Sequence, residues 1–334
     1  MAMNADQILA VELIKQGHNV VLTGQAGSGK TFTIHNSCME LDKLEIKYAL
    51  TCSTGIATCA YDERAWTLNK WCGILDGRYS NDELIHLMNT DERYVEIKKR
   101  ICQTQCLIID EVSMISAKTL GQVEFILRKA RNCEKRFGGM QVVLCGDFFQ
   151  LPPVENELYG DSGKHCFQTT FFDQCFPHKI NLHIIYRQNE RDLIIAVNEL
   201  EQGKVSDATL AVMHSLNRPL PEFVSEEEAV HLFCRNADAD IHNYNVIANK
   251  QGNLVTFSSE DTGDSYYLSK MLAPKHLGLK VGVKVILLTN LSDDLVNGKS
   301  GMVHSIQGDS VHVVFQINKK KHHLSLKKIH LYFI

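Results

Sequence analysis

The stretch that most constrains this chain is GQAGSGKT, at residues 24–31. It has the spacing of a P-loop, with one glycine, four further residues and then Gly-Lys-Thr. Residues 19–23 (NVVLT) precede it with a short β-branched and aliphatic run, which predicts a buried strand. Residues 32–41 follow it without glycine or proline, which favours a helix. A strand, a glycine-rich turn and a helix in this order predict a phosphate-binding loop rather than a chance turn.

The chemistry of such a loop follows from its backbone. Glycine lets backbone N–H groups turn inward around a phosphate, and the N-terminus of the following helix adds partial positive charge. We expect Lys30 to reach the β and γ phosphates and Thr31 to ligate Mg²⁺. The residues expected to hold the nucleotide are Gly24, Gln25, Ala26, Gly27, Ser28, Gly29, Lys30 and Thr31. The loop therefore predicts that the protein binds a nucleoside triphosphate.

Composition places the chain among ordinary globular proteins. With 334 residues, 44% hydrophobic and 22% charged, it is long enough for two domains with cores of their own. No apolar stretch approaches the roughly 20 residues of a membrane span, so we expect no membrane partner. The formal net charge of −4 gives no general nucleic-acid signature, so any DNA site is expected to be a local groove. The eleven cysteines include no Cys-x-x-Cys and follow no secretion signal, which predicts free thiols and no zinc site.

An acidic pair follows a second aliphatic run. Residues 105–109 (QCLII) predict a strand, and Asp110 and Glu111 come directly after it. Asp110 suits binding of the nucleotide's Mg²⁺, and Glu111 suits positioning or deprotonating the attacking water. Because neighbouring side chains of a strand point to opposite faces, we expect both acids in the loop beyond the strand. The alternative is a structural cap for a helix predicted over residues 113–130.

Two further predicted strands carry polar residues at their ends. Residues 47–54 (KYALTCST) form one strand, after which Thr54 and Gly55 offer a hydroxyl and N–H groups to a ligand crevice. Residues 141–145 (QVVLC) form another, and Gln150 follows it in a position to sense the γ-phosphate. Four strands thus alternate with helices and gather ligand groups at their carboxyl ends. This pattern predicts a nucleotide-binding parallel α/β domain.

Some residues of this first part allow two interpretations. An amphipathic helix over residues 6–15 carries Gln7, which either reads the adenine edge or is simply a polar helix residue. Trp66 and Trp71 are either stacking platforms for bases or buried side chains. Residues 78–105 are charged and helical in pattern, which indicates either a solvated helix pair or a small insertion at the domain's rim.

The pattern changes from Phe171 onward. Residues 179–185 (KINLHII) predict a strand that leads to Arg187 and then to a helix ending near Leu200. An arginine so far beyond the first site is a candidate arginine finger, reaching across the cleft from a second domain. Residues 231–235 (HLFCR) predict a strand at the start of a second α/β domain.

The last part of the chain is β-rich. Its predicted strands are separated by Asn-Gly, Gln-Gly-Asp and lysine-rich turns, and they lie at residues 283–289, 302–306, 311–317 and 323–333. This spacing predicts a small meander or barrel of about 60 residues. The KKKHH stretch at residues 319–323 either contacts a phosphate backbone or forms a solvated hairpin tip.

Several motifs occur in one order: GQAGSGKT, STGIA, TLNKW, DEVSM, GDFFQLPPV, YRQ and LVNGKSGMV. With them the chain resembles the PIF (petite integration frequency) family of DNA helicases, in the branch of superfamily one that contains RecD. The likeness runs from Gln7 to about Val303. It implies an ATP-driven motor that moves 5′ to 3′ along single-stranded DNA and opens duplexes or G-quadruplexes. It also implies roles in genome and telomere maintenance, DNA repair and recombination.

The resemblance assigns roles to residues one by one. Gln7 matches the adenine-reading glutamine of the family, and Thr54 and Gly55 match the stretch that contacts the DNA backbone. Asn69 stands where the family usually has a histidine in contact with DNA. The residues that match the family's catalytic set are Lys30, Asp110, Glu111, Gln150 and Arg187, and those that match its magnesium ligands are Thr31 and Asp110.

The resemblance also implies an architecture. It places a first RecA-like P-loop ATPase domain at residues 1–175, with a wedge-like insertion at about 75–98. A partial second RecA-like domain would occupy residues 176–272, and a small SH3-like β-barrel residues 273–334. The expected cofactors are ATP and Mg²⁺, and the expected partners are single-stranded DNA and DNA junctions. A monomer is expected, in the nucleus, with the mitochondrion as a second compartment.

One departure from the family affects the functional hypothesis. The family continues beyond the barrel with a His-Lys-Ser-Gln-Gly stretch of the second motor domain. Residues 304–308 (HSIQG) resemble it superficially but lie among predicted hairpins, so we interpret them as a turn. We therefore expect a C-terminally truncated helicase in which nucleotide binding survives and hydrolysis is weak. The alternative hypothesis is a nucleotide- and DNA-binding module without motor activity.

Overall fold

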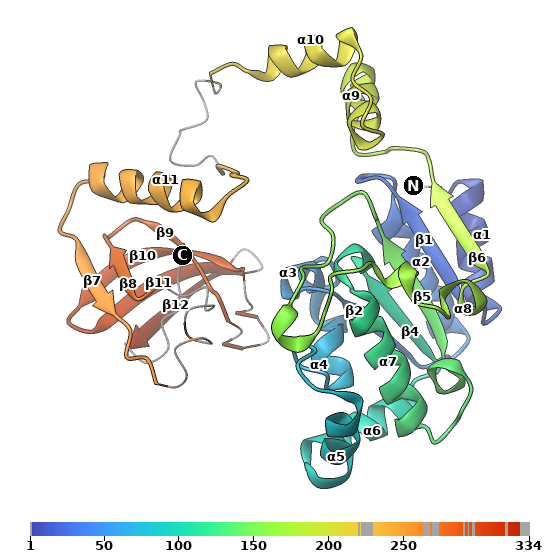
Figure 1. Ribbon diagram of the computed structural model, residues 1–334. Coiled ribbons are helices and arrows are strands. Elements are labelled where there is room, and N and C mark those ends of the chain that lie inside the picture. Colours follow the sequence, from blue (N-terminus) through green and yellow to red (C-terminus); the bar gives the residue numbers. More distant parts are fainter. Residues whose placement is uncertain are drawn as a thin grey trace. The chain divides into compact units, whose positions relative to one another are not determined.

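The computed structural model describes residues 2–219, 221, 230–262, 268, 274–289, 291–292, 294–295, 298–317 and 320–327. The chain divides into two compact units, Met1–Asn217 and Arg218–Ile334 (Figure 1). Within the described part, no helix combines the length and the apolar character needed to cross a membrane.

The first unit is built around a six-stranded parallel sheet with the order β3-β2-β4-β5-β1-β6. Its strands are β1 (Val20–Gly24), β2 (Tyr48–Cys52), β3 (Ala65–Thr67), β4 (Cys106–Asp110), β5 (Gln141–Gly146) and β6 (His178–Leu182). Every residue of β4 is buried, as expected for a central strand of a parallel sheet that is covered on both faces. The predicted parallel α/β domain is confirmed.

Helices cover both faces of this sheet (Figure 1). One face packs against α1 (Ala5–Lys15) and α2 (Lys30–Lys43). The opposite face packs against α4 (Leu68–Cys72), α6 (Arg93–Gln103) and α7 (Ala117–Ala130). The remaining helical elements of this unit are α3 (Gly55–Thr58), η1 (Cys59–Arg64), α5 (Asn81–Thr90), η2 (Val112–Met114), η3 (Arg136–Gly139), η4 (Glu157–Tyr159), η5 (Cys166–Gln168), α8 (Phe172–Cys175), α9 (Arg191–Glu201) and α10 (Asp207–Leu216).

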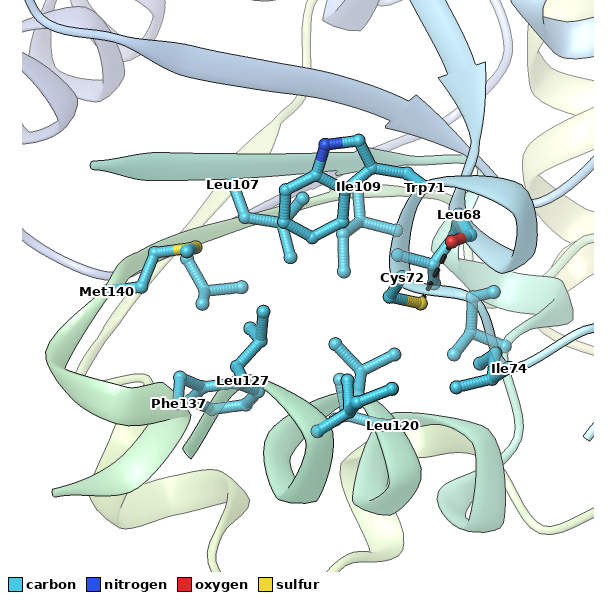
Figure 2. Packing of buried hydrophobic residues seen from close by; sticks show 14 of the residues in the cluster. Leu68, Trp71, Cys72, Ile74, Leu107, Ile109, Leu120, Leu127, Phe137 and Met140 are labelled. Atoms are coloured by element: carbon cyan, nitrogen blue, oxygen red, sulfur yellow. Dashed lines mark hydrogen bonds between the residues drawn. The ribbon is translucent and has the colours of Figure 1, made fainter. Parts of the chain in front are cut away.

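The alternation of side chains along β4 creates two separate cores. Cys106 and Ile108 belong to the cluster on the α1 and α2 side. Leu107 and Ile109 point to the other side, where Figure 2 shows them facing α7. This period of two is the geometry of a strand with both faces buried.

The second unit is mostly antiparallel. Helix α11 (Asn236–Asn249) precedes a two-stranded sheet and a four-stranded sheet of order β12-β11-β10-β9. These strands are β7 (Val255–Ser258), β8 (His276–Leu279), β9 (Lys284–Ile286), β10 (Ser300–Gln307), β11 (Ser310–Ile317) and β12 (Lys320–Lys327). Gly301 is needed here, because a Cβ on it would lie 2.7 Å from Val313 Cγ1 and 2.8 Å from the ring of Phe315. The HSIQG stretch lies in the β10–β11 hairpin, as expected.

Three expectations about organisation differ from the structure. Strand β6 pairs with β1 rather than with a second sheet, so the first compact unit continues to Asn217 instead of ending at residue 175. Strand β3 was not predicted, because three residues are too short for a recognisable pattern. The strand predicted at residues 231–235 is wrong: the backbone there is irregular and exposed, and it pairs with none of the strands that the structure describes. Predicted strand residues 328–333, residues 296–297 of the LVNGKSGMV motif and Lys319 lie outside the described residues.

Burial bears on two of the open interpretations. Trp71 is buried, whereas the side chain of Trp66 is 41% exposed and lies beneath the cationic groups of Lys70 and Arg100. The two helices α5 and α6 are not simply solvated. Their apolar residues Leu84, Met88, Tyr94, Ile97 and Ile101 pack into the core beside α7.

The thiols differ sharply in exposure. Among the described cysteines, Cys102 in α6 and Cys234 ahead of α11 are exposed. Burial raises the pKa of the Cys72 thiol to about 12 and that of the Cys38 thiol to about 11. None of these cysteines forms a disulfide, in agreement with the prediction of thiols.

A core substitution tests the packing of the first unit. Leu127 of α7 is fully buried, so Leu127→Ala is expected to lower the free energy of unfolding by about 2–5 kcal/mol. Both tryptophans lie in the first unit, and urea unfolding followed by their fluorescence therefore reports on this unit. The exposed Leu200 of α9 gives the matched control, for which we expect a change within about 0.5 kcal/mol. Equal effects of the two substitutions would contradict the packing described here.

Candidate nucleotide-binding site

The glycine-rich loop connects β1 directly to α2. Gly27 and Gly29 have φ values of 86° and 88°, in the left-handed region that favours glycine. A Cβ at Gly27 would lie 2.5 Å from Arg187 Cβ, and one at Gly29 would lie 2.5 Å from Gln7 Nε2. Glycine is thus required for two reasons, the backbone conformation and the close approach of two side chains.

A cleft of about 490 Å³ opens over this loop within the first unit. It is lined by Gln7, Ala26, Gly27, Gly29, Lys30, Thr31, Phe32, Asp110, Glu111, Gln150, Tyr186 and Arg187. The structure therefore brings together residues from α1, the loop, and the ends of β4, β5 and β6. Gly24, Gln25 and Ser28, which were also expected at the nucleotide, lie in the loop itself.

Buried polar atoms in the loop fit an anionic ligand. Lys30 Nζ donates to the carbonyl oxygens of Gly24 and Gln25, at 2.6 and 3.2 Å. Gln25 Nε2 and Ser28 Oγ are buried and have no hydrogen-bond partner in the described structure. Buried polar groups are nearly always paired, so these atoms and the glycine-lined cleft suit a phosphate-bearing molecule.

The oxygen donors fit magnesium held together with phosphates. Thr31 and Asp110 contribute a hydroxyl and a carboxylate to the cleft, and hard oxygen ligands are those that Mg²⁺ prefers. Among the described residues, no group of three or more His, Cys, Asp and Glu side chains is arranged to hold a metal alone. Mg²⁺ commonly uses one or two carboxylates together with water and substrate phosphates, and Thr31 and Asp110 fit that donor set.

The two acids meet at the end of β4. Asp110 is the last residue of the strand, not part of the loop as predicted, and it is buried. Its Oδ1 accepts a hydrogen bond from Glu111 N at 2.8 Å, and its Oδ2 accepts one from Tyr61 Oη at 2.5 Å. Glu111 has a φ of 54°, which is uncommon for a residue other than glycine. This turn brings both carboxylates to the same cleft.

The electrostatic environment of these groups is acidic. Burial, and then the charge of Asp110, raise the pKa of the Glu111 carboxyl, while Lys30 opposes the shift. Burial and the same Asp110 charge raise the pKa of the Tyr61 phenol well above its ordinary value. Tyr61 is therefore a neutral hydrogen-bond donor throughout the physiological range.

Asp147 was missed as a member of the site. It is buried just after β5, and its Oδ2 accepts a hydrogen bond from Gln150 Nε2 at 3.0 Å. It thereby fixes the side chain that was expected to sense the γ-phosphate. The signal was present in the sequence, because Asp147 follows a buried strand closely, much as Asp110 does.

Arg187 reaches the cleft from the same compact unit as the loop. The expectation that it comes from a second domain across the cleft differs from the structure, because β6 lies beside β1. Tyr186 N donates to Gly27 O at 2.8 Å, and Tyr186 Oη accepts from Asn4 Nδ2 at 3.1 Å. Tyr186, which was not predicted, therefore ties the segment before α9 to the loop.

Gln7 both caps α1 and lines the cleft. Its Oε1 accepts from Asn4 N at 3.0 Å, which completes a capping box at the start of α1. Its Nε2 donates to Ser28 O at 3.5 Å, and the residue also lines the cleft.

The expected DNA contacts lie outside the nucleotide cleft. Thr54 and Gly55 follow the carboxyl end of β2, and Asn69 lies in the first turn of α4, directly after β3. Because β2 and β3 are paired and parallel, these residues come to the same edge of the sheet. Thr54 Oγ1 accepts from Ala57 N at 3.3 Å, which orders the start of α3.

The chain is similar to known proteins over most of its length. Residues 2–208 match the model of the PIF1-like helicase family, and residues 268–306 match the model of the DNA helicase Pif1 2B domain. The ATP-dependent DNA helicase PIF1 of Emericella nidulans is 33% identical over 305 residues, which are 87% of this chain and 40% of that protein. The chain thus spans about two fifths of the length of this curated relative.

Two solved structures show the same likeness. A Pif1 helicase from Candida albicans has a TM-score of 0.79 and 28% identity, covering 98% of this chain and 79% of that chain. A Pif1 helicase from Bacteroides, solved in complex with ADP-AlF3 and ssDNA, has a TM-score of 0.77 and 25% identity, covering 98% and 75%. With its glycine-rich loop, acidic pair and parallel sheet, the chain belongs to the PIF1-like helicase family.

Proposed function

We propose that this chain carries the nucleotide-binding site of an ATP-dependent DNA helicase that moves 5′ to 3′ along single-stranded DNA. The observation that carries the proposal is one cleft that gathers Lys30, Asp110, Glu111, Gln150 and Arg187 from separate elements. The Bacteroides relative was solved with ADP-AlF3 and ssDNA, which supports both ligands. Opening of duplexes, junctions or G-quadruplexes, action as a monomer, and residence in the nucleus or mitochondrion belong to the same proposal.

Binding of the nucleotide rests on the loop and on α1. The loop N–H groups and Lys30 hold the phosphates. To do so, the Lys30 ammonium gives up its hydrogen bonds to Gly24 O and Gln25 O and donates to phosphate oxygens instead. Gln7 lines the same cleft, which supports a role for its amide in reading adenine. Thr31 and Asp110 would hold magnesium, which when bound neutralises charge on the phosphates.

Hydrolysis rests on Glu111, Gln150 and Arg187. Glu111 accepts a proton from the attacking water or orients it, and its raised pKa makes the carboxylate a stronger base than an exposed one. Gln150 is held by Asp147 at the edge of the cleft. Arg187 provides the positive charge that offsets charge developing on the γ-phosphate.

DNA is proposed to bind at the edge formed by the carboxyl ends of β2 and β3. Thr54 and Gly55 offer a hydroxyl and N–H groups to the phosphate backbone, and Asn69 lies nearby in α4. Hydrogen bonds of this kind do not depend on base sequence, which suits a motor that must move along any strand.

ATPase measurements test the function. The wild-type chain is expected to hydrolyse ATP faster when single-stranded DNA is added, because DNA contacts and nucleotide site share one sheet. Lys30→Ala should remove at least about 99% of this activity, and Arg187→Ala should lower it by roughly 10³-fold. Lys43→Ala, at the exposed end of the same helix, is the matched control and should leave the rate unchanged. Nucleotide binding without DNA-stimulated hydrolysis would indicate a binding module instead of a motor.

A glycine pair tests the shape of the loop. Gly27→Ala places a Cβ 2.5 Å from Arg187 Cβ, so we expect the affinity for ADP to fall by about tenfold or more. Gly17→Ala is the control, because Gly17 has a similar φ of 84° but no atom within 4 Å of the added Cβ. Titration calorimetry with ADP should show a loss only for Gly27→Ala. Similar losses of ADP affinity in Gly27→Ala and Gly17→Ala would mean that backbone strain, and not the contact with Arg187, is responsible.

The raised pKa of Glu111 predicts a pH-dependent cost in stability. As pH rises through the ordinary carboxyl pKa to the raised value, the unfolded state loses its proton first, so the folded state becomes less stable. Glu111→Gln has no such charge, and its melting temperature should exceed that of the wild type at neutral pH. The difference should shrink toward zero at acid pH, below the ordinary pKa. A difference that does not change between pH 4 and pH 7 would contradict this expectation.

A further inference from the structure

A buried tyrosine contacts the acid at the centre of the site. Tyr61 lies in η1 with only 1% of its surface exposed, and its ring packs in the core on the α2 side of the sheet. Its hydroxyl donates to Asp110 Oδ2 at 2.5 Å. It does not line the cleft, so it reaches the nucleotide only through Asp110.

Together with the backbone, Tyr61 fixes both oxygens of that carboxylate. Oδ1 accepts from Glu111 N and Oδ2 accepts from Tyr61 Oη. A carboxylate offers about four lone-pair directions, so two such bonds orient the group and still leave acceptor capacity for a metal. Partners of this kind, which orient a metal ligand without touching the metal, commonly change metal affinity or activity by about 10–100-fold.

Tyr61 also connects two parts of the molecule. Its element η1 directly continues α3, which begins at Gly55, the expected contact to the DNA backbone. A second contact connects the same two segments, because Ser53 N donates a hydrogen bond to Asp110 O at 3.1 Å. A shift of the segment after β2 would therefore move the hydroxyl that orients Asp110.

We propose that Tyr61 is a positioning residue that orients Asp110 for magnesium and links the segment beginning at Thr54 and Gly55 to the nucleotide site. The proposal rests on the proposed function of that site. It assigns the effect to the hydroxyl and not to the ring, because the ring serves the core. Tyr61→Phe therefore separates positioning from packing.

The test measures the affinity of the full 334-residue chain for a fluorescent ADP derivative, once with MgCl₂ and once with EDTA. Tyr61→Phe should reduce the gain in affinity that magnesium gives by at least about tenfold. The affinity in EDTA should stay within about twofold of the wild type, because the loop and Lys30 are unchanged. Addition of oligo(dT) should change the MgCl₂ concentration that the wild type needs for tight binding of the ADP derivative. The same addition should have little effect on the concentration that Tyr61→Phe needs.

Tyr94→Phe is the matched control. Tyr94 is equally buried in the first unit, and its hydroxyl donates to Gly73 O at 2.6 Å, away from the cleft. The Tyr94→Phe variant loses one buried hydroxyl, as Tyr61→Phe does. It should bind the ADP derivative like the wild type, both with MgCl₂ and with EDTA. Equal behaviour of the two variants would overturn the proposal.

A double variant tests whether Tyr61 acts through Asp110. In an Asp110→Asn background, Tyr61→Phe should add no further loss of magnesium-dependent affinity. An additional loss of tenfold would mean that Tyr61 acts by another route, and would overturn the proposal. The side chain that Asp110→Asn introduces is neutral, so no buried charge loses its partner when the phenol hydroxyl is removed. The comparison of Asp110→Asn with the double variant therefore remains valid even if Tyr61→Phe alone lowers the melting temperature. A wild type that fails to bind the ADP derivative would instead overturn the proposed function.

Discussion

Parallel pairing of β1 with both β5 and β6 is the constraint on which the rest of the first unit depends. It sets the carboxyl ends of the strands along one edge, so the loop after β1 lies between the ends of β5 and β6. Gln150 and Arg187 reach the cleft over the loop for this reason. No long-range electrostatic effect is needed to assemble the cleft, because backbone hydrogen bonds of the sheet already determine which ends are neighbours.

The assembled site contains groups that a folded protein would otherwise avoid. Glu111 adopts a left-handed backbone conformation, and its half-buried carboxyl lies beside Asp110. Ser28 Oγ lies buried with no partner in the described structure. Such local costs are tolerated because the apolar cores on both faces of the sheet hold the strand ends in place. These strained or unpaired groups belong to the loop and the acidic pair, where the nucleotide is proposed to bind.

Much of the first unit follows from short-range sequence patterns. The loop, its flanking strand and helix, and the strand before Asp110 are each determined by residues close in sequence, so they were predictable. The place of β6 was not, because pairing between β1 and β6 depends on residues far apart in the chain. For the same reason Tyr61 was missed as the partner of Asp110, because it joins the site only through a tertiary contact. Asp147 is different: it contacts Gln150 three residues further on, so its signal was present in the sequence. The strand expected at residues 231–235 shows the converse error, because the apolar residues there pair with no strand in the described part of the chain.

The distribution of cysteines has a practical consequence for studying motion. Burial protects thiols such as Cys38 and Cys72, whose raised pKa values also suppress the reactive thiolate. Cys102 and Cys234 are the exposed ones among the described cysteines, and each lies in a different compact unit. A donor and an acceptor dye attached to these two thiols would form a built-in distance sensor. Energy transfer between them would then follow any change in spacing of the two units during nucleotide exchange, without introducing a new residue.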